Sequence, residues 1–328
     1  MAMLTARATD KSTARPRRDR LPAAGNDTVS LAAAIRDLGV TLTTHLTRLD
    51  DQITSVLGLL SSPRPGTAPL AVGQAPPSIA VRCLGAFMVN AAGTRIEEWR
   101  SSRARALFQY LVTHRGHPIP RETLIQALWP DPDAAAAGTS LKVAVHVLRR
   151  VLGEHGIARG QLDIQAHESG YQLVAPELWI DVEEFEHCYT VGRAREARGQ
   201  HDQALALFTR AAELYQGDFL EESLDDWPMF RREALKDQYL FVVSRLAQQA
   251  EARGDYQEAI TRCQQILAKD CCREDAYRLL MLCHARLGQR GRVRRWYELC
   301  IHTLQTELDC GPEPETENVY RLALSGKV

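Results

Sequence analysis

The segment from Thr139 to Arg150 combines hydroxyl, imidazole, ammonium and guanidinium groups at helical spacing. A rotation of about 100° per residue places these groups in one arc of about 120°, opposite an apolar arc. With the adjoining Ser140, the polar arc comprises Thr139, Lys142, Val143, His146, Arg149 and Arg150. Donors of these types, with one valine for methyl contacts, suit base edges in the major groove and the flanking phosphates. The alternative is an ordinary solvated helix surface. The neighbouring elements decide between this interpretation and a DNA-binding face.

Those elements are typical of a winged helix-turn-helix over residues 79–175. The expected order is two strands (Ile79–Cys83, Phe87–Val89), a helix capped by Ser101 or Ser102, a short helix from Pro120 to Trp129, a helix from about Ala135 to Leu152 closed by Gly153, and a hairpin of Leu162–Ala166 with Tyr171–Val174. This arrangement docks its last helix on duplex DNA. Arg159, before the hairpin, and His167, in its turn, are the candidate phosphate contacts of the wing.

Three shorter segments precede this region. Residues 1–26 are rich in arginine and lack apolar periodicity, so we expect a disordered basic tail. Residues 27–60 carry one apolar stripe with a repeat of about 3.6 residues, which predicts an amphipathic helix. That helix either packs on the protein's own body or forms a short self-associating coiled coil, which we favour. Residues 61–78 contain five prolines and two glycines and are predicted to be a linker.

Residues 176–328 are expected to be almost entirely helical. Two similar segments that begin at Gly254 and Gly288 stand 34 residues apart, which is the tetratricopeptide period, and a third copy begins at Gly199. Each copy opens a helix, so the pattern predicts an array of helical hairpins. The residues from Asp181 to Glu184 have the form of a capping box. The predicted fold class is therefore mainly α: an N-terminal amphipathic helix, a winged helix-turn-helix and a tetratricopeptide-like array.

The net charge of −1 conceals a difference between these regions. Residues 80–175 hold eleven basic and eight acidic side chains, giving +3, whereas residues 176–328 hold twenty and twenty-seven, giving −7. This difference in charge indicates a nucleic-acid-binding domain joined to a second domain that does not bind nucleic acid.

Several classes of protein are disfavoured. Phosphate-cradling, zinc-peptidase and serine-hydrolase motifs are absent from the sequence, so we expect no enzyme and no cofactor. No apolar run approaches the roughly 20 residues of a membrane span, and no secretory signal is recognised, so we expect a cytoplasmic protein with no membrane partner. Cys263, Cys271, Cys272, Cys283 and His284 could suggest metal or redox sensing, but cysteines within helical repeats are more often small buried hydrophobes.

The sequence also resembles a known family. The matching residues of the first region are Arg105-Ala106-Leu107, His114-Arg115-Gly116, Ala127-Leu128-Trp129-Pro130, Leu148-Arg149-Arg150-Val151-Leu152-Gly153 and Gly170-Tyr171-Gln172-Leu173. Those of the second are Tyr215-Gln216-Gly217-Asp218-Phe219-Leu220, Trp227, Arg231-Arg232, Ala276-Tyr277-Arg278-Leu279-Leu280-Met281, Tyr297, Cys300, Glu307-Leu308 and Pro312-Glu313-Pro314-Glu315-Thr316. Together they resemble SARP-type (Streptomyces antibiotic regulatory protein) activators, in which a winged helix of response-regulator type precedes a bacterial transcriptional activator domain.

The resemblance implies sequence-specific binding to promoter repeats and recruitment of RNA polymerase with its sigma factor. It also implies a homodimer or higher oligomer supported by the helical domain. Relatives often have Arg-Asn where this chain has Gly138-Thr139, so we expect one phosphate contact of the family to be missing here and the preferred DNA sequence to differ. The apolar helix within 27–60 is an addition to the family pattern.

Two further hypotheses remain open. In one, the helical array is a receptor that binds a small molecule or a protein and controls DNA binding, because tetratricopeptide arrays bind ligands in their grooves. In the other, the protein is an RNA-binding or purely structural scaffold, which would not prefer one promoter duplex over scrambled DNA.

Overall fold

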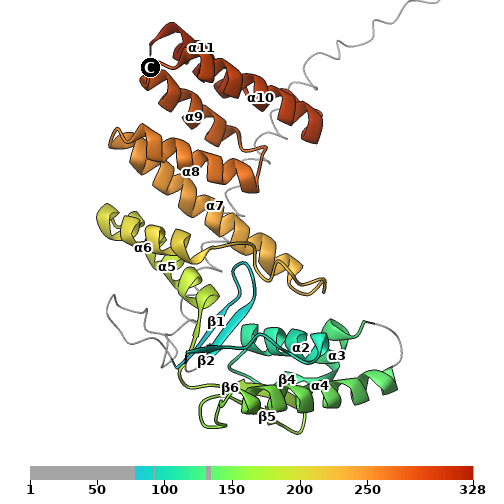
Figure 1. Cartoon of the computed structure of the whole chain (residues 1–328). Helices are drawn as coiled ribbons and strands as arrows, with labels where there is room; N and C mark the ends of the chain where they lie inside the picture. The colour runs from blue at the N-terminus through green and yellow to red at the C-terminus, as the bar shows by residue number, and fades with distance from the viewer. Residues whose placement is uncertain (1–77, 92, 131–133, 328) are drawn as a thin grey trace, which may run out of the picture. The chain divides into compact units, whose positions relative to one another are not determined.

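The computed structural model describes residues 78–91, 93–130 and 134–327 (Figure 1). The predicted basic tail (1–26), the amphipathic helix (27–60) and nearly all of the predicted linker lie outside the described residues. The described chain is mainly helical and comprises a winged helix-turn-helix followed by a helical array, which confirms the fold class for this part of the chain.

A small four-stranded sheet begins the winged helix. Its strands are β1 (Ile79–Arg82), β2 (Met88–Ala91), β3 (Thr94–Arg95) and β7 (Leu178–Ile180), in the order β3-β2-β1-β7. β1 and β2 pair antiparallel, and β7 joins β1 in parallel. The residues of β1 and β2 alternate in burial, because successive side chains of a strand point to opposite faces of the sheet. The β7 pairing was not anticipated, since it links residues about a hundred positions apart.

Three helices follow in the chain and pack against one another: α2 (Ser102–Thr113), α3 (Arg121–Leu128) and α4 (Ala134–Glu154). Ser101 caps α2, because its hydroxyl accepts a hydrogen bond from the Ala104 N–H at 3.3 Å. Leu107, Leu124 and Leu148 are fully buried and join the three helices in one core. The prediction that Gly153 closes the third helix was wrong, because α4 continues through it to Glu154. A glycine whose backbone remains helical does not stop a helix.

A second sheet forms the wing beside α4. Its strands are β4 (Ile119–Pro120), β5 (Asp163–Ala166) and β6 (Gly170–Val174), in the order β4-β6-β5 (Figure 1). The hairpin of β5 and β6 agrees with the sequence pattern, but β4 was not predicted. Gly170 permits this third strand to pair, because a Cβ there would lie 1.8 Å from the carbonyl oxygen of Ile119.

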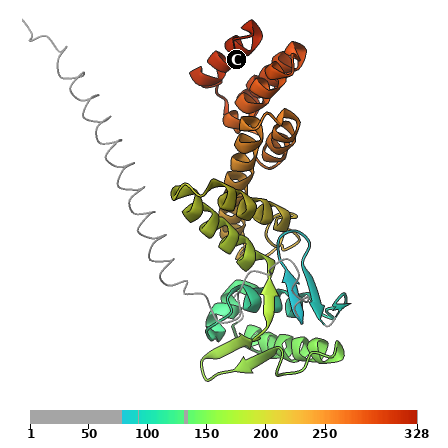
Figure 2. The same cartoon turned by 90° about the vertical axis from the view of Figure 1, so that its left-hand side faces the viewer.

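Seven helices form the array between residues 181 and 325 of the described chain, and they stack as neighbouring pairs (Figures 1 and 2). They are α5 (Asp181–Ala197), α6 (His201–Leu214), α7 (Met229–Ala252), α8 (Tyr256–Lys269), α9 (Glu274–Arg286), α10 (Arg290–Leu308) and α11 (Pro314–Ser325). The three predicted repeat segments each end one helix and open the next. Gly199, Gly254 and Gly288 have φ of 74°, 78° and 71°, the left-handed conformation that glycine adopts without strain at the end of a helix.

Asp181 joins the first sheet to the array, in a role that its sequence context did not suggest. Its carboxylate accepts hydrogen bonds from the backbone N–H groups of Cys83 (2.8 Å), Leu84 (2.9 Å) and Val182 (2.8 Å). The capping-box prediction was wrong, because Ile180 is the N-cap of α5. Glu184 accepts hydrogen bonds from the Trp179 indole and from Arg210 instead of reaching back to the helix end.

No helix in the described ranges is both long enough and apolar enough to cross a bilayer.

Candidate nucleic-acid interface

Helix α4 has two faces of opposite character. Its buried face, which anchors the helix in the winged-helix core, comprises Leu141, Ala144, Val145, Leu148, Val151 and Leu152. On the outward face, Thr139, Lys142 and His146 are exposed and Val143 is 56% exposed. The helix therefore presents the residues that the periodicity places together, on a rigid support.

Lys142 and His146 are the most available donors on this face. Both side chains are exposed, and within the described residues neither makes a hydrogen bond or an ion pair. The partly exposed Ser140 hydroxyl donates to the carbonyl oxygen of Ala136 at 2.9 Å, one turn earlier in the helix. Lys142 and His146 can therefore meet a base edge or a phosphate without first breaking an internal contact.

Arg149 is engaged with the protein itself. Its Nε and Nη2 atoms donate to the carbonyl oxygen of Ile164 in β5 at 3.2 and 2.5 Å. The guanidinium thus ties α4 to the wing, although the sequence pattern indicated a phosphate contact. Its remaining N–H groups and its charge still lie on the exposed side of α4. The geometry therefore gives Arg149 a positioning role between the two elements.

Arg150 forms an exposed ion pair at the end of α4. Its Nε lies 2.9 Å from Glu154, one turn later, and Arg100 donates to the same carboxylate at 2.8 Å. The hydrogen bond from Arg150, with that from Arg100, lowers the pKa of Glu154 below its usual value. The Arg150 side chain is 60% exposed. Because exposed ion pairs are weak, Arg150 can exchange Glu154 for a phosphate.

The two wing candidates differ in accessibility. Arg159 is exposed in the loop before β5. His167 is partly buried, and its backbone N–H donates to the Gly170 carbonyl oxygen at 2.8 Å. Its Nε2 atom is shielded from solvent and has no hydrogen-bond partner among the residues that the structure describes. His167 in this conformation therefore shapes the turn of the wing and does not offer its Nε2 to a phosphate.

Arg121 is a basic residue of the wing that the sequence pattern did not single out. Its Nη2 donates to the His167 carbonyl oxygen at 3.3 Å, and its guanidinium lies 5.9 Å from the centroid of the Tyr171 ring. These contacts place an exposed cation beside the turn of the hairpin. The signal was weak, since it consisted of one arginine after a proline, and only the β4–β6 pairing brings it to the wing.

The cysteines of the array do not gather into a metal centre within the described part of the chain, where no group of three or more potential ligands is placed to hold an ion. Cys263 and Cys283 are fully buried, and burial raises the pKa of the Cys283 thiol to about 12. Cys271 is exposed at the turn between α8 and α9.

Comparison with known proteins agrees with this division of the chain. Residues 97–173 match the family of the transcriptional regulatory protein C-terminal domain, and residues 180–324 match the bacterial transcriptional activator domain. The described chain is therefore a transcriptional regulator that joins a DNA-binding winged helix to a helical array. These are the two domains, in the same order, of SARP-type activators, and they confirm the family resemblance.

Individual relatives are similar over different lengths. Transcriptional regulatory protein MoaR1 of Mycobacterium tuberculosis is 25% identical over 74% of this chain and 78% of its own. Transcriptional regulatory protein EmbR of the same species is 29% identical over 43% of this chain and 36% of its own. Regulatory protein DnrI of Streptomyces peucetius is 27% identical over 43% and 53%.

A solved structure shares the fold. The structure of Mycobacterium tuberculosis EmbR in complex with a low-affinity phosphopeptide superimposes with a TM-score of 0.62 at 22% identity, over 76% of this chain and 66% of EmbR. The similarity therefore supports the winged-helix and array architecture. The alignment spans slightly less than two thirds of EmbR, which leaves part of that protein without a counterpart in the alignment.

Proposed function

We propose that this protein is a transcriptional activator that binds promoter repeats through α4 and recruits RNA polymerase with its sigma factor. The observation that carries the proposal is the outward face of α4. There, Lys142 and His146 project from a helix anchored by buried leucines and have no partner among the described residues. The reading face comprises Thr139, Ser140, Lys142, Val143, His146 and Arg150, with Arg159 and Arg121 at the wing. Arg149 holds the wing against α4.

Selection of bound duplexes from a random pool, followed by mobility-shift titrations, tests this face. Lys142→Ala or His146→Ala should change which base is preferred, at about 1–3 kcal/mol for each lost bidentate contact. Arg150→Ala should weaken binding to every sequence alike and reduce the salt dependence by about one ion. A base preference that survives both Lys142→Ala and His146→Ala would place the reading face elsewhere.

Arg149 provides a matched contrast with Arg150. If Arg149 positions the wing, then Arg149→Ala should lower affinity and loosen the wing, measured as faster amide hydrogen exchange in β5. Arg150→Ala should leave that exchange unchanged, because its only described ion-pair partner is the exposed Glu154. Equal amide hydrogen exchange of β5 in the two variants would mean that Arg149 does not position the wing and only contacts a phosphate.

We infer in addition that the protein acts as a homodimer or higher oligomer, with the segment 27–60 as one pairing element. Residues 61–78 would then let two winged helices meet half-sites about 34–36 Å apart, since eighteen residues of coil reach about 23 Å. A chain beginning at Ser78 should have a lower oligomeric mass and weaker binding to paired sites. Retention of the full-length mass and affinity would exclude this role.

A receptor function of the array is a second candidate, because the array contains a lined cavity. Specific DNA binding by the purified protein without any additive would favour the simple activator. Binding that requires a metabolite would favour the receptor.

A further inference from the structure

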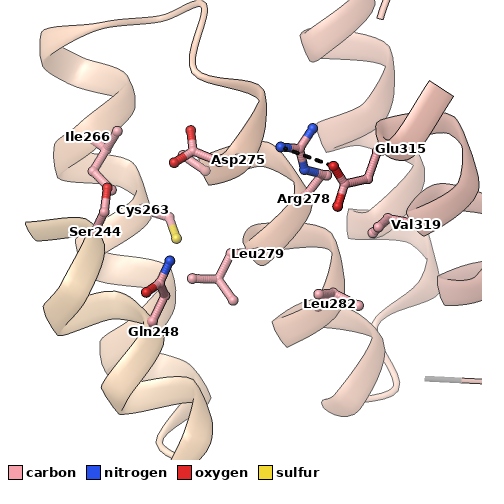
Figure 3. Close-up of a pocket in the computed structure, with 11 residues that line it drawn as sticks. Ser244, Gln248, Cys263, Ile266, Asp275, Arg278, Leu279, Leu282, Glu315 and Val319 are labelled. Carbon is pink, nitrogen blue, oxygen red and sulfur yellow. Dashed lines mark ion pairs between the residues drawn. The ribbon is translucent and has the colours of Figure 1, made fainter. Parts of the chain in front are cut away.

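A cavity of about 180 Å³ lies within the array, where α7, α8, α9 and α11 meet (Figure 3). Its lining combines aliphatic residues with a small number of polar and charged ones, which is the usual composition of a small-molecule site. A volume of this size holds about six waters at roughly 30 Å³ each, and thus an organic ligand of about ten non-hydrogen atoms.

One part of the lining is apolar. Ile266 from α8, Leu279 and Leu282 from α9, and Val319 from α11 contribute their aliphatic side chains (Figure 3). The Cys263 thiol adds to this surface, since burial raises its pKa far above the ordinary value and keeps it uncharged. This part suits a branched aliphatic group.

The charged part of the lining contains one cation, Arg278, whose N–H donors are not all engaged in hydrogen bonds within the described structure. Arg278 Nη1 is 2.8 Å from Glu313 and 2.9 Å from the Thr316 hydroxyl. Within the described ranges, the one carboxylate near its Nη2 atom is that of Glu315, at 3.8 Å, which is beyond hydrogen-bond distance. Figure 3 shows this loose pair beside the cavity. Arg278 therefore keeps donors that a carboxylate can accept.

Glu315 is an anion beside Arg278 that makes few contacts with the rest of the described protein. Its side chain is 72% exposed, and its one ion pair in the described structure is the 3.8 Å contact with Arg278. The third charged residue, Asp275, is already satisfied, because Arg273 donates to its two oxygens at 2.9 and 2.7 Å. Burial raises the pKa of Asp275, but the Arg273 guanidinium outweighs this effect and keeps the pKa below its usual value.

We propose that this cavity binds a free aliphatic α-amino acid, with its carboxylate on Arg278, its ammonium on Glu315 and its side chain against Leu279, Leu282 and Val319. A zwitterion matches an adjacent cation and anion in both sign and spacing, and it can replace their weak mutual contact with two charge-assisted hydrogen bonds. A ligand with a single charge would form a charge-assisted hydrogen bond with one of the two groups and not with the other.

Isothermal titration calorimetry on the full chain tests this assignment with L-leucine as the probe. L-Leucine should bind saturably, whereas 3-methylbutan-1-amine, which lacks the carboxylate, and 4-methylpentanoate, which lacks the ammonium, should each bind at least tenfold more weakly. No saturable heat with L-leucine up to its solubility would overturn the proposal. Equal binding of either single-charge analogue would do the same.

A pair of variants on α11 provides the control. Glu315→Gln should weaken leucine binding at least tenfold, whereas Glu317→Gln, which alters an exposed acid in the same first turn outside the cavity lining, should leave it unchanged. Leucine affinity that is the same in Glu315→Gln and the unaltered chain would refute the ammonium site. DNA binding by both variants without leucine should equal that of the unaltered chain, so failure here is separate from failure of the proposed DNA interface.

Discussion

The winged helix and the helical array use basic residues for different purposes. On α4, Lys142 and His146 project without a partner in the part of the chain that the structure describes. In the array, Arg210 pairs with Glu184 at 2.8 Å, Arg262 with Glu258 at 2.7 Å and Arg273 with Asp275 at 2.7 Å. The comparison teaches that the number of arginines does not define a nucleic-acid surface. A surface is available for phosphates where its cations lack nearby carboxylates, and the acidic composition of residues 176–328 supplies carboxylates to these three arginines of the array.

The largest expected effect on the free energy of unfolding comes from replacing a tightly packed glycine, and each region contains one such glycine. Gly170→Ala in the wing should lower the free energy of unfolding by about 3 kcal/mol or more, because the new Cβ would meet the backbone oxygen of Ile119 at 1.8 Å. Gly192→Ala in α5 should cost about 1–3 kcal/mol, because its Cβ would meet the Phe208 ring at 2.6 Å, and a side chain can shift more readily than backbone. Urea unfolding measures both, and a larger loss for Gly192→Ala would contradict this ranking.

The pH dependence of stability tests the link between the two regions. Burial raises the pKa of Asp181 to about 6, against 3.8 for an ordinary aspartate. Because the folded-state pKa is the higher one, the stabilisation is complete below about pH 3.8 and is lost as the pH rises through 6. The free energy of unfolding, taken relative to Asp181→Asn, should therefore fall by about 2 kcal/mol between pH 4 and pH 7. A constant difference between the two proteins over this range would show that Asp181 stays ionised in the folded state.

A smaller effect is expected from the ion pair between the winged helix and α5. Arg115 follows α2 and makes a two-pronged contact with Glu183, and the two side chains are largely buried. Arg115→Met should cost about 1–3 kcal/mol, because it leaves the Glu183 carboxylate without its partner. The double variant Arg115→Met with Glu183→Met should recover part of the loss in the same unfolding measurement. Additive losses would mean that the two residues do not stabilise each other.

The smallest expected effect has the opposite sign. Gly153 lies within α4, and a Cβ there would meet no atom within 4 Å. Gly153→Ala should therefore raise the free energy of unfolding by about 0.5–1 kcal/mol, because alanine loses less backbone entropy in a helix. A thermal melt detects this as a small increase in Tm. A decrease in Tm would mean that position 153 needs glycine, as it would if the helix ended there.

Much of the fold was predictable because its signals are local. The opposed apolar and polar arcs of α4 follow from the spacing of residues such as Leu148 and His146, and the repeat glycines mark where successive helices of the array end and begin. The strands β4 and β7 were missed, since each is short and pairs with a strand about fifty or one hundred residues away. For the candidate site, the sequence indicated which residues face outward on α4 but not which of them already have a partner.

The amino-acid sequence alone thus determined the order of the winged helix and the array, the buried apolar face of α4 and the repeated helical hairpins. These features are local, because helical spacing and turn chemistry act over a few neighbouring positions. Tertiary structure decided that Arg149 holds Ile164 in the wing, that Asp181 holds the backbone of Cys83, and that Arg278 and Glu315 line one cavity. Each of these contacts joins residues 15 to 98 positions apart, or from different helices, and depends on how the packed elements orient them. Hydrogen bonds form only within about 3 Å, and the chain must be folded before such distances exist.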